Sequence, residues 1–383
     1  MKILLFPGSF DPFHSGHINV IEAANKQFNF DKLYLILSKN SVNKKAIATV
    51  EQRLDMLKLG LPFCKCNIEI DDYEYTKSKS GYSIETVRYF KDIYPNDDLY
   101  LLIGLDQVNV FNAWKEAKEI KSLVNIIYYD RPGYCETSPN IIKYNMMKVN
   151  GFSRDISSTD IRNLNKLDAP LPILNYITLH KLYFAHDVYN LLDLRRYRHS
   201  MSVANLCYEI AEANGYNSIK AKAFMVGLLH DIGKYADITE LNTIMHEHFS
   251  EYIDLPVYAY HQFVGSYYAA TQFNILDADI LNAIKYHCTG RHGMSVLEKI
   301  AYVADKIDPL RGYDSKYMID LCKANITGGF IYVLSQNIEF NMNKHKEKDN
   351  YSDNRLTADC VDDYLNNKHH QEREKNNDAR FDY

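Results

Sequence analysis

Two histidines near the amino terminus are spaced so that both could act on one phosphate group. His14 and His17 stand three residues apart in the stretch F-P-G-S-F-D-P-F-H-S-G-H. Gly8 and Ser9 allow backbone N–H groups to approach an anion, and a helix that begins near Gly16 turns its positive end toward phosphate. Imidazoles placed there hydrogen-bond phosphate oxygens as charge builds up in a transition state. The stretch predicts a nucleotide triphosphate site, although it lacks the G-K-[ST] of a P-loop.

The second half of the chain offers a different set of potential ligands, imidazoles together with carboxylates. They are His199, the adjacent pair His230 and Asp231 in L-L-H-D-I-G-K, then His261, His287 and Asp305. This donor set suits zinc, manganese or iron and is a poor match to calcium. Helices of a bundle can bring such distant ligands to one metal. Chance proximity is the alternative, because the chain has 14 histidines, and the remaining ones receive no role.

Strands and helices of the first half must position His14 and His17, and the sequence there alternates apolar runs with helical patterns. The runs cover residues 3–6, 33–37, 99–103 and 124–129, and the helical patterns cover residues 16–26, 50–60, 83–92 and 111–120. Short, strongly apolar strands that alternate with helices indicate a doubly wound parallel sheet covered on both faces. Thr49 with Gln52 matches a capping box that starts the second helix.

The second set lies in a region where strand patterns vanish and helical patterns follow one another. We expect helices over residues 195–214, 219–231, 239–248, 258–273, 278–287 and 295–307. We therefore predict an α/β domain over residues 1–184 and an all-α helical bundle over residues 185–342. Residues 343–383 are rich in charged side chains and poor in apolar ones, which predicts a disordered tail.

Composition narrows the class of protein. A formal net charge of −5 argues against a nucleic-acid partner or an anionic membrane surface. No apolar run approaches the length of a membrane span. The apolar run at residues 3–6 is too short for the apolar region of a signal peptide. Seven cysteines without paired spacing favour free thiols in a reducing cytoplasm. Homo-oligomers are compatible with this composition.

The motifs of the first half resemble those of the nicotinate-nucleotide adenylyltransferase family within the H-x-G-H nucleotidyltransferases. Besides G-S-F-D-P-F-H-S-G-H, the chain carries G-Y-S-I-E-T, L-L-I-G-L-D-Q followed by W, R-P-G-Y and I-S-S-T-D-I-R. The resemblance implies a Rossmann-like fold, Mg²⁺ with ATP, and in-line attack of the acceptor phosphate on ATP. It implies catalytic roles for His14, His17 and Arg162. It implies ATP binding by Gly8, Ser9, Phe10, His14, Gly16, His17, Gly104, Asp106, Ser157, Ser158, Thr159 and Arg162, and pyridine mononucleotide binding by Lys44, Thr86, Trp114 and Arg131.

Several of these assignments have alternatives. The family usually has G-G where Pro7 and Gly8 stand, and pantetheine-phosphate adenylyltransferases begin with P-G-S-F-D-P, so the first motif leaves the acceptor open between a pyridine mononucleotide and phosphopantetheine. The stretch S-S-T can simply cap a helix, as can Asp106. Trp114 can be a core residue. Lys45 is as good a candidate for a phosphate ligand as Lys44. Nicotinate and nicotinamide mononucleotide are not distinguished.

The motifs of the second half resemble HD-domain metal phosphohydrolases. Y-H-C-T-G-R followed by V-A-D-K-I-D-P is similar to the bacterial family that splits diadenosine tetraphosphate symmetrically into two ADP. The resemblance implies a metal, iron or another divalent transition metal, held by His199, His230, Asp231 and Asp305. It implies that Asp231 also orients the attacking water. It implies contacts from Lys234, His261, His287 and Arg311 to the substrate phosphates, or from the two histidines to a second metal.

Two further hypotheses compete for the second half. It could be a nucleotide-sensing module that regulates the transferase, or a hydrolase of another nucleotide. The sequence I-G-K that follows His230 and Asp231 differs from the residues common at this place in that bacterial family. This difference weakens the assignment of the substrate. An RNA nuclease is disfavoured because no basic stripe with interleaved aromatic residues is present.

Overall fold

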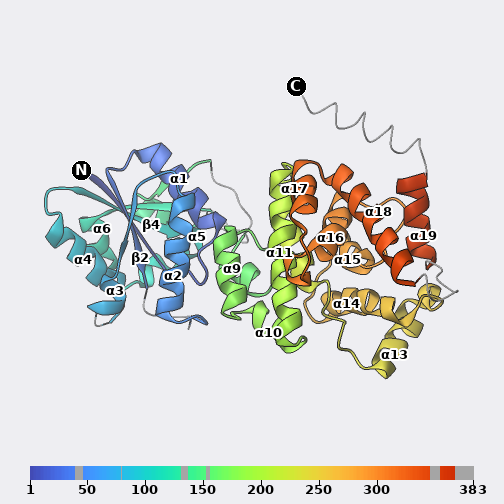
Figure 1. The fold of residues 1–383 in the computed structure, drawn as a ribbon. Coiled ribbons are helices and arrows are strands. Elements are labelled where there is room, and N and C mark those ends of the chain that lie inside the picture. Colours follow the sequence, from blue (N-terminus) through green and yellow to red (C-terminus); the bar gives the residue numbers. More distant parts are fainter. Residues whose placement is uncertain (39–45, 79, 131–136, 152–155, 346–353, 367–383) are drawn as a thin grey trace. The chain divides into compact units, whose positions relative to one another are not determined.

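A computed structural model of the chain describes residues 1–38, 46–78, 80–130, 137–151, 156–345 and 354–366 (Figure 1). The chain folds into two compact units. The first comprises Met1–Arg162 and Asp168–Tyr176, and the second comprises Asn163–Leu167 and Ile177–Tyr383. Within the described residues, no helix combines the length and apolarity that crossing a membrane requires.

The first unit is built on a six-stranded sheet in the order β3-β2-β1-β4-β5-β6. Every neighbouring pair is parallel. The strands are β1 (Lys2–Gly8), β2 (Lys32–Leu37), β3 (Ile68–Asp71), β4 (Asp98–Gly104), β5 (Asn125–Tyr129) and β6 (Met147–Lys148). The predicted doubly wound parallel sheet is confirmed. The short strands β3 and β6 extend it at its two edges.

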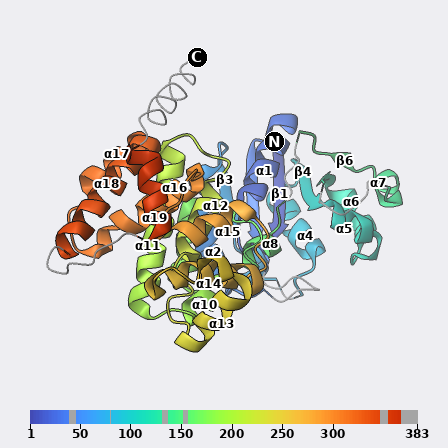
Figure 2. The same ribbon diagram turned by 90° about the vertical axis from the view of Figure 1, so that its right-hand side faces the viewer.

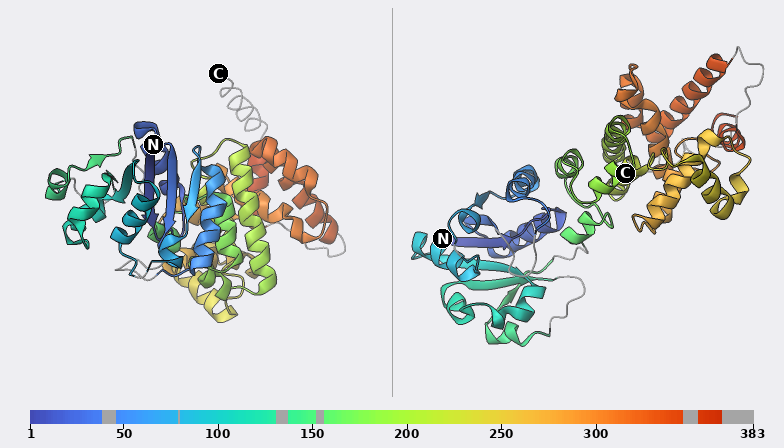
Figure 3. Two further views of the ribbon diagram at one scale, coloured as in Figure 1. Left: turned by 90° about the vertical axis from the view of Figure 1, so that its left-hand side faces the viewer. Right: turned by 90° about the horizontal axis from the view of Figure 1, so that it is seen from below.

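Helices cover both faces of this sheet, with α1 and α2 on one face and α4 to α6 on the other (Figure 3). Ile3 and Leu5 of β1 pack among Val87, Val108 and Ile120 in the core of the second of these faces. The helices of the unit are α1 (Ser15–Phe28), α2 (Val50–Gly60), η1 (Leu61–Phe63), α3 (Tyr73–Thr76), α4 (Ser83–Ile93), α5 (Leu105–Val110), η2 (Phe111–Ala113), α6 (Ala117–Leu123), α7 (Pro139–Lys143), α8 (Ser158–Arg162) and α9 (Leu171–Leu179, which passes into the second unit).

The strand order places a ligand crevice beside β1. The chain winds outward from β1 to β2 and β3, and then returns to add β4 on the other side of β1. At such a switch point the loops after adjacent strands diverge and leave a crevice outside the carboxyl ends of the strands. The turn between β1 and α1, which carries the histidine motif, lies at this edge.

The second unit is helical among its described residues, as predicted (Figure 2). Its elements are α10 (Phe184–Asn190), α11 (Leu194–Ala213), α12 (Lys220–Leu229), α13 (Ile238–His248), η3 (Ser250–Tyr252), η4 (Val257–Ala259), α14 (Tyr260–Thr271), α15 (Ala278–Tyr286), α16 (Val296–Ile307), η5 (Pro309–Arg311), α17 (Lys316–Ala324), α18 (Ile326–His345), α19 (Arg355–Val361) and the π-helical turn η6 (Asp362–Asn366).

Two glycines permit the close packing that brings the polar side chains of this unit together. A Cβ atom on Gly227 of α12 would lie 2.6 Å from the Cα of Ala204 on α11. A Cβ atom on Gly233 would lie 2.5 Å from both the backbone N of Gly265 and the carbonyl oxygen of His261. Because real Cβ contacts are never that short, only glycine lets these backbones approach.

The predicted disordered tail is wrong for residues 354–366, which form α19 and η6. Leu356, Cys360 and Tyr364 are buried there. Tyr364 accepts a hydrogen bond from the backbone N of Met294 at 2.7 Å. The segment is polar on average, but its few apolar side chains are spaced to bury one helical face, and composition alone hides that spacing.

Candidate active sites

The two histidines of the first motif are fixed by the start of α1. His14 is the N-cap residue, and its Nδ1 accepts a hydrogen bond from the backbone N of Gly16 at 3.1 Å. The Nδ1 of His17 accepts one from the backbone N of His14 at 3.2 Å. The two imidazole rings lie 3.7 Å apart between centroids, and the His17 ring stacks on Phe13. The pair thus forms a capping box made of imidazoles.

This geometry fixes the tautomer of both rings. A neutral imidazole has one N–H donor and one acceptor nitrogen. Because Nδ1 accepts in His14 and in His17, the hydrogen of each neutral ring lies on Nε2. Each ring therefore offers an N–H donor, the form that suits a phosphate oxygen.

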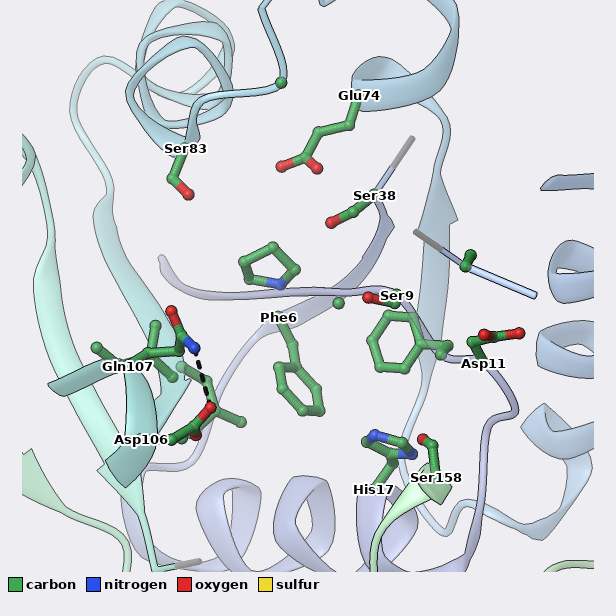
Figure 4. A pocket seen from close by; sticks show the side chains of 18 of the residues that line it. Phe6, Ser9, Asp11, His17, Ser38, Glu74, Ser83, Asp106, Gln107 and Ser158 are labelled. Atoms are coloured by element: carbon green, nitrogen blue, oxygen red, sulfur yellow. Dashed lines mark hydrogen bonds between the residues drawn. The ribbon is translucent and has the colours of Figure 1, made fainter. Parts of the chain in front are cut away.

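A cavity of about 730 Å³ opens at this edge of the sheet (Figure 4). Most of the predicted ATP-binding residues line it, namely Gly8, Ser9, Phe10, His17, Gly104, Asp106, Ser157, Ser158, Thr159 and Arg162. In Figure 4, His17 and Ser158 lie at one end of the hollow, and Glu74 and Ser83 lie at the other. His14 and Gly16 are not among its lining residues, and they contact each other in the turn beside it.

The S-S-T motif caps α8 and also faces the cavity. The Ser157 hydroxyl donates to Asp160 Oδ2 at 2.6 Å and accepts from the backbone N of Asp160. The Ser158 hydroxyl donates to the carbonyl oxygen of Pro12 at 3.0 Å, which ties this helix to the turn after β1. Arg162 donates to the carbonyl oxygen of Asp11 at 2.6 Å and to the Thr159 hydroxyl at 2.8 Å. The capping interpretation therefore holds, and the guanidinium also reaches the cavity wall.

The other predicted nucleotide ligands of the first unit divide into three groups. Trp114 lines the cavity, half-buried against Phe111, with ring centroids 5.1 Å apart. Thr86 is buried and is not among the lining residues. Lys44 and Arg131 lie outside the described residues, as does Lys45.

The sequence analysis missed a polar group at the far end of the cavity. Glu74 and Ser83 line it, together with Ser38 and Tyr82. Glu74 belongs to the single turn α3, in the stretch D-D-Y-E-Y that shows no clear periodicity. The position of Ser83 directly after Gly81-Tyr82 in a quoted motif was the signal available for that residue.

In the second unit, six predicted side chains converge into one group, the histidine–aspartate cluster (His199, His230, Asp231, His261, His287 and Asp305). Asp231 is central to it. Its Oδ2 lies 3.3 Å from His230 Nε2 and 3.9 Å from His199 Nε2, and its Oδ1 lies 3.4 Å from His261 Nε2 and 3.8 Å from His287 Nε2. Asp305 Oδ1 lies 3.2 Å from His199 Nε2. All six side chains are buried.

Three of the four imidazoles of the cluster are held in the opposite tautomer to those of the first unit. His230, His261 and His287 each hydrogen-bond through Nδ1 to the carbonyl oxygen three residues earlier, at 2.7 to 2.8 Å. His199 Nδ1 lies 2.6 Å from Asp308 Oδ2. Since a carbonyl oxygen only accepts, Nδ1 carries the hydrogen in those three rings, and Nε2 turns a lone pair toward the centre.

Burial and neighbouring charges shift the pKa values of the cluster in both directions. Burial acts to lower the pKa of His199, but the Asp305 and Asp308 carboxylates outweigh it and raise that pKa. Burial, with the Lys234 ammonium nearby, lowers the pKa of His261 to about 4. Burial also holds the pKa of His287 well below its usual range. Burial acts to raise the pKa of Asp231, but His230 and His287 outweigh it and hold that pKa well below the usual value. Neutral imidazoles and ionised carboxylates are the forms that bind metals.

Cationic side chains surround the carboxylates of the cluster. Arg196, which the sequence analysis missed, donates to Asp231 Oδ2 at 2.7 Å. Arg311 and Lys306 form ion pairs with Asp305. These cations offset the two buried acids.

The donor set fits a divalent metal ion. Two triplets have ligand atoms that all lie within 4.8 Å of one another, His199–His230–Asp231 and Asp231–His261–His287. The buried Nε2 of His230 has no hydrogen-bond partner within the described part of the chain. A buried polar atom normally has a partner, so a nitrogen left in this state is what a metal ligand requires. Asp231 belongs to both triplets.

Fold and sites together define a nucleotidyltransferase domain joined to a metal-binding helical domain, and comparison with known families agrees. Residues 5–164 match the cytidylyltransferase-like family, and residues 196–310 match the HD domain. The solved structure described as a "predicted HD superfamily hydrolase involved in NAD metabolism" from Clostridium acetobutylicum is 26% identical, with a TM-score of 0.41. That similarity covers 50% of this chain and 97% of the other.

Relatives narrow the class further. A protein of Opitutus terrae named "Probable nicotinate-nucleotide adenylyltransferase" is 32% identical over 188 residues, which are 47% of this chain and 92% of that protein. A Mycoplasma genitalium protein named "Probable nicotinate-nucleotide adenylyltransferase/Ap4A hydrolase" is 29% identical, over 87% of this chain and 97% of that protein. The chain belongs to the nicotinate-nucleotide adenylyltransferase family.

Proposed function

We propose that the chain carries two activities on adenine nucleotides. One transfers the adenylyl group of ATP to nicotinate mononucleotide and releases pyrophosphate. The other hydrolyses diadenosine tetraphosphate to two ADP. The names of the Mycoplasma relatives, which match nearly the whole chain, support the combination.

The transferase proposal rests mainly on the fixed histidine pair. An oxygen of the acceptor 5′-phosphate attacks the α-phosphorus of ATP, the bond from that phosphorus to the bridging oxygen breaks, and pyrophosphate leaves. No protein nucleophile is needed, because positioning and charge stabilisation carry such transfers. The Nε2–H group of His17, which lines the cavity, donates to a phosphate oxygen as charge moves to the leaving group, and Arg162 adds positive charge beside it. We assign the same role to His14, which lies in the turn beside the cavity. Mg²⁺ is expected to accompany ATP.

An acceptor panel tests the transferase proposal. Purified protein receives Mg-ATP with nicotinate mononucleotide, nicotinamide mononucleotide or phosphopantetheine, and pyrophosphate release is followed. Preference for nicotinate mononucleotide supports the proposal. Preference for phosphopantetheine would contradict it and would mean that Pro7 and Gly8 predict the acceptor better than the later motifs do.

The hydrolase proposal rests on the convergence of the histidine–aspartate cluster. We assign His199, His230, Asp231 and Asp305 to the metal, with iron as the first candidate. A divalent metal there supplies an acidified water and a polarised phosphoryl group. The Asp231 carboxylate, ionised because its pKa is depressed, orients the attacking water.

The charged groups around the cluster complete this proposal. Lys234 and Arg311 neutralise the phosphates of the substrate, as does Arg196 once its carboxylate partner binds metal. His261 and His287 contact phosphate or hold a second ion.

Product analysis tests the hydrolase proposal. The protein is stripped with a chelator, reloaded separately with Fe²⁺, Mn²⁺, Zn²⁺ or Mg²⁺, and incubated with diadenosine tetraphosphate. ADP as the sole product supports symmetrical hydrolysis. Equal amounts of ATP and AMP would contradict it, and nucleotide binding without turnover under every metal would favour a sensing module.

A further inference from the structure

A buried carboxyl group lies in the wall of the cavity, away from its phosphate end. The Glu74 side chain is 3% exposed, yet it lines the cavity. In Figure 4 both of its oxygens point into the hollow between Ser83 and Ser38, at the opposite end from His17 and Ser158. Burying a carboxyl group is costly unless hydrogen bonds compensate for the lost water.

Neighbouring hydroxyl groups hold this carboxyl in place. The Thr86 hydroxyl, buried behind it on α4, donates to Glu74 Oε1 at 2.8 Å. Burial raises the pKa of Glu74, and hydrogen bonds from Thr86 and Ser38 act against that rise. A carboxylate has about four lone-pair positions, more than two hydroxyl donors occupy. The group therefore keeps acceptor capacity on the side that faces the cavity.

The position along the cavity indicates which ligand would reach this group. If the reacting phosphates lie near His17, the acceptor nucleotide extends away from them toward Trp114, Tyr82 and Ser83, which line the same cavity. Glu74 lies at that end. A ligand there must offer a hydrogen-bond donor, because a second carboxylate placed against Glu74 would be repelled unless a proton is shared.

We propose that Glu74 binds the acceptor mononucleotide directly, as the hydrogen-bond acceptor for an O–H donor of that ligand. The inference rests on the proposed transferase function. The donor is a ribose hydroxyl, because nicotinate mononucleotide carries a carboxylate on its ring, and that group cannot donate. Thr86 is then a positioning residue that acts through Glu74, which explains why a predicted pyridine-binding residue lies behind the cavity wall.

Direct binding measurements on the variant Glu74→Gln test this proposal. Calorimetric titration with nicotinate mononucleotide, nicotinamide mononucleotide and Mg-ATP gives three dissociation constants for each protein. We expect the dissociation constants of both mononucleotides to rise about 10- to 100-fold, the range for a hydrogen bond to a charged group. The dissociation constant of Mg-ATP should stay within about twofold, because that ligand relies on the other end of the cavity.

The two mononucleotides share the ribose and differ only at the ring substituent. Equal loss of affinity for both supports a ribose contact, and loss for nicotinamide mononucleotide alone would contradict it. Unchanged mononucleotide affinity would overturn the proposal. So would an equal loss for all three ligands, since a structural defect acts on the whole cavity. Binding is read without turnover, so an absence of adenylyl transfer in the unmodified protein would count against the proposed function alone.

Two further variants keep the test interpretable. Glu69→Gln makes the same change at an exposed position of β3 that does not line the cavity, and it should bind all three ligands normally. Thr86→Val removes the hydroxyl that donates to Glu74, and it should weaken mononucleotide binding in the same direction but to a smaller extent. If Glu74→Gln fails to fold, an unchanged mononucleotide affinity in Thr86→Val would overturn the proposal.

Discussion

The partner of one ring nitrogen decides what a histidine does in this molecule. In the first unit Nδ1 of His14 and of His17 accepts a backbone N–H, so Nε2 keeps a hydrogen to donate. In the second unit Nδ1 of His230, His261 and His287 faces a carbonyl oxygen, so Nε2 keeps a lone pair. The same side chain thus suits a phosphate in one place and a metal in the other.

Asp308 is the residue whose removal tests this idea at the metal cluster. It is fully buried, and it binds both His199 Nδ1 and the hydroxyl of Ser202. We expect Asp308→Asn to lower metal affinity about 10- to 100-fold, as the loss of a residue that hydrogen-bonds a metal-ligating histidine generally does. Competition with a coloured chelator measures this affinity. Asp320→Asn, at an exposed site of the same unit, should leave it unchanged, and an equal affinity in both variants would contradict the assignment.

At the scale of single elements, the sequence predicted those with strong patterns. The strands that became β1, β2, β4 and β5 are nearly continuous apolar runs, and the capping box predicted at Thr49 formed. The strands β3 and β6 were missed because each is short and half-exposed, without an apolar run. Glu74 was missed for a similar reason, because one turn of helix carries no periodicity.

Gly233, in the H-D-I-G-K motif, tests how tightly the elements around the cluster are packed. The variant Gly233→Ala forces a Cβ atom against the backbone of Gly265 and His261, so we expect unfolding of the second unit to become easier by about 1 to 3 kcal/mol. Thermal and urea unfolding measure the change. In Gly328→Ala on α18 the Cβ atom would meet the Asn325 side chain at 3.6 Å, an ordinary van der Waals distance, so this variant should be neutral or slightly stabilising. Equal stability of the two variants would refute the packing argument.

The helix at the end of the described chain provides a second element-scale prediction. Tyr364 is 1% exposed, and its ring packs edge-on against Phe330 of α18. Tyr364→Ala should destabilise the second unit by about 3 to 5 kcal/mol through the cavity it leaves. Tyr364→Phe, which removes only the hydroxyl that accepts from Met294, should cost about 1 kcal/mol. Denaturant unfolding that finds no change for Tyr364→Ala would mean that this segment does not pack as described.

At the scale of the whole molecule, each candidate site is built from the described residues of one compact unit. The described residues of the cavity all belong to the first unit, and all members of the histidine–aspartate cluster belong to the second. The sequence predicted the six members of the histidine–aspartate cluster and many of the residues that line the cavity, because their spacing follows family motifs. It could not predict Glu74, Asp308 or Arg196, whose roles arise only when distant elements pack together.

Separate sites predict separable activities, and one comparison tests that claim most directly. The unmodified protein, His17→Ala and Asp231→Ala are assayed side by side for adenylyl transfer to nicotinate mononucleotide and for hydrolysis of diadenosine tetraphosphate. We predict that His17→Ala lowers the transfer rate about 10²- to 10³-fold, the cost of losing one donor to a charged transition state, and leaves hydrolysis intact. We predict the reverse pattern for Asp231→Ala, because it removes a ligand shared by both metal triplets. Loss of both activities in either variant would contradict the account.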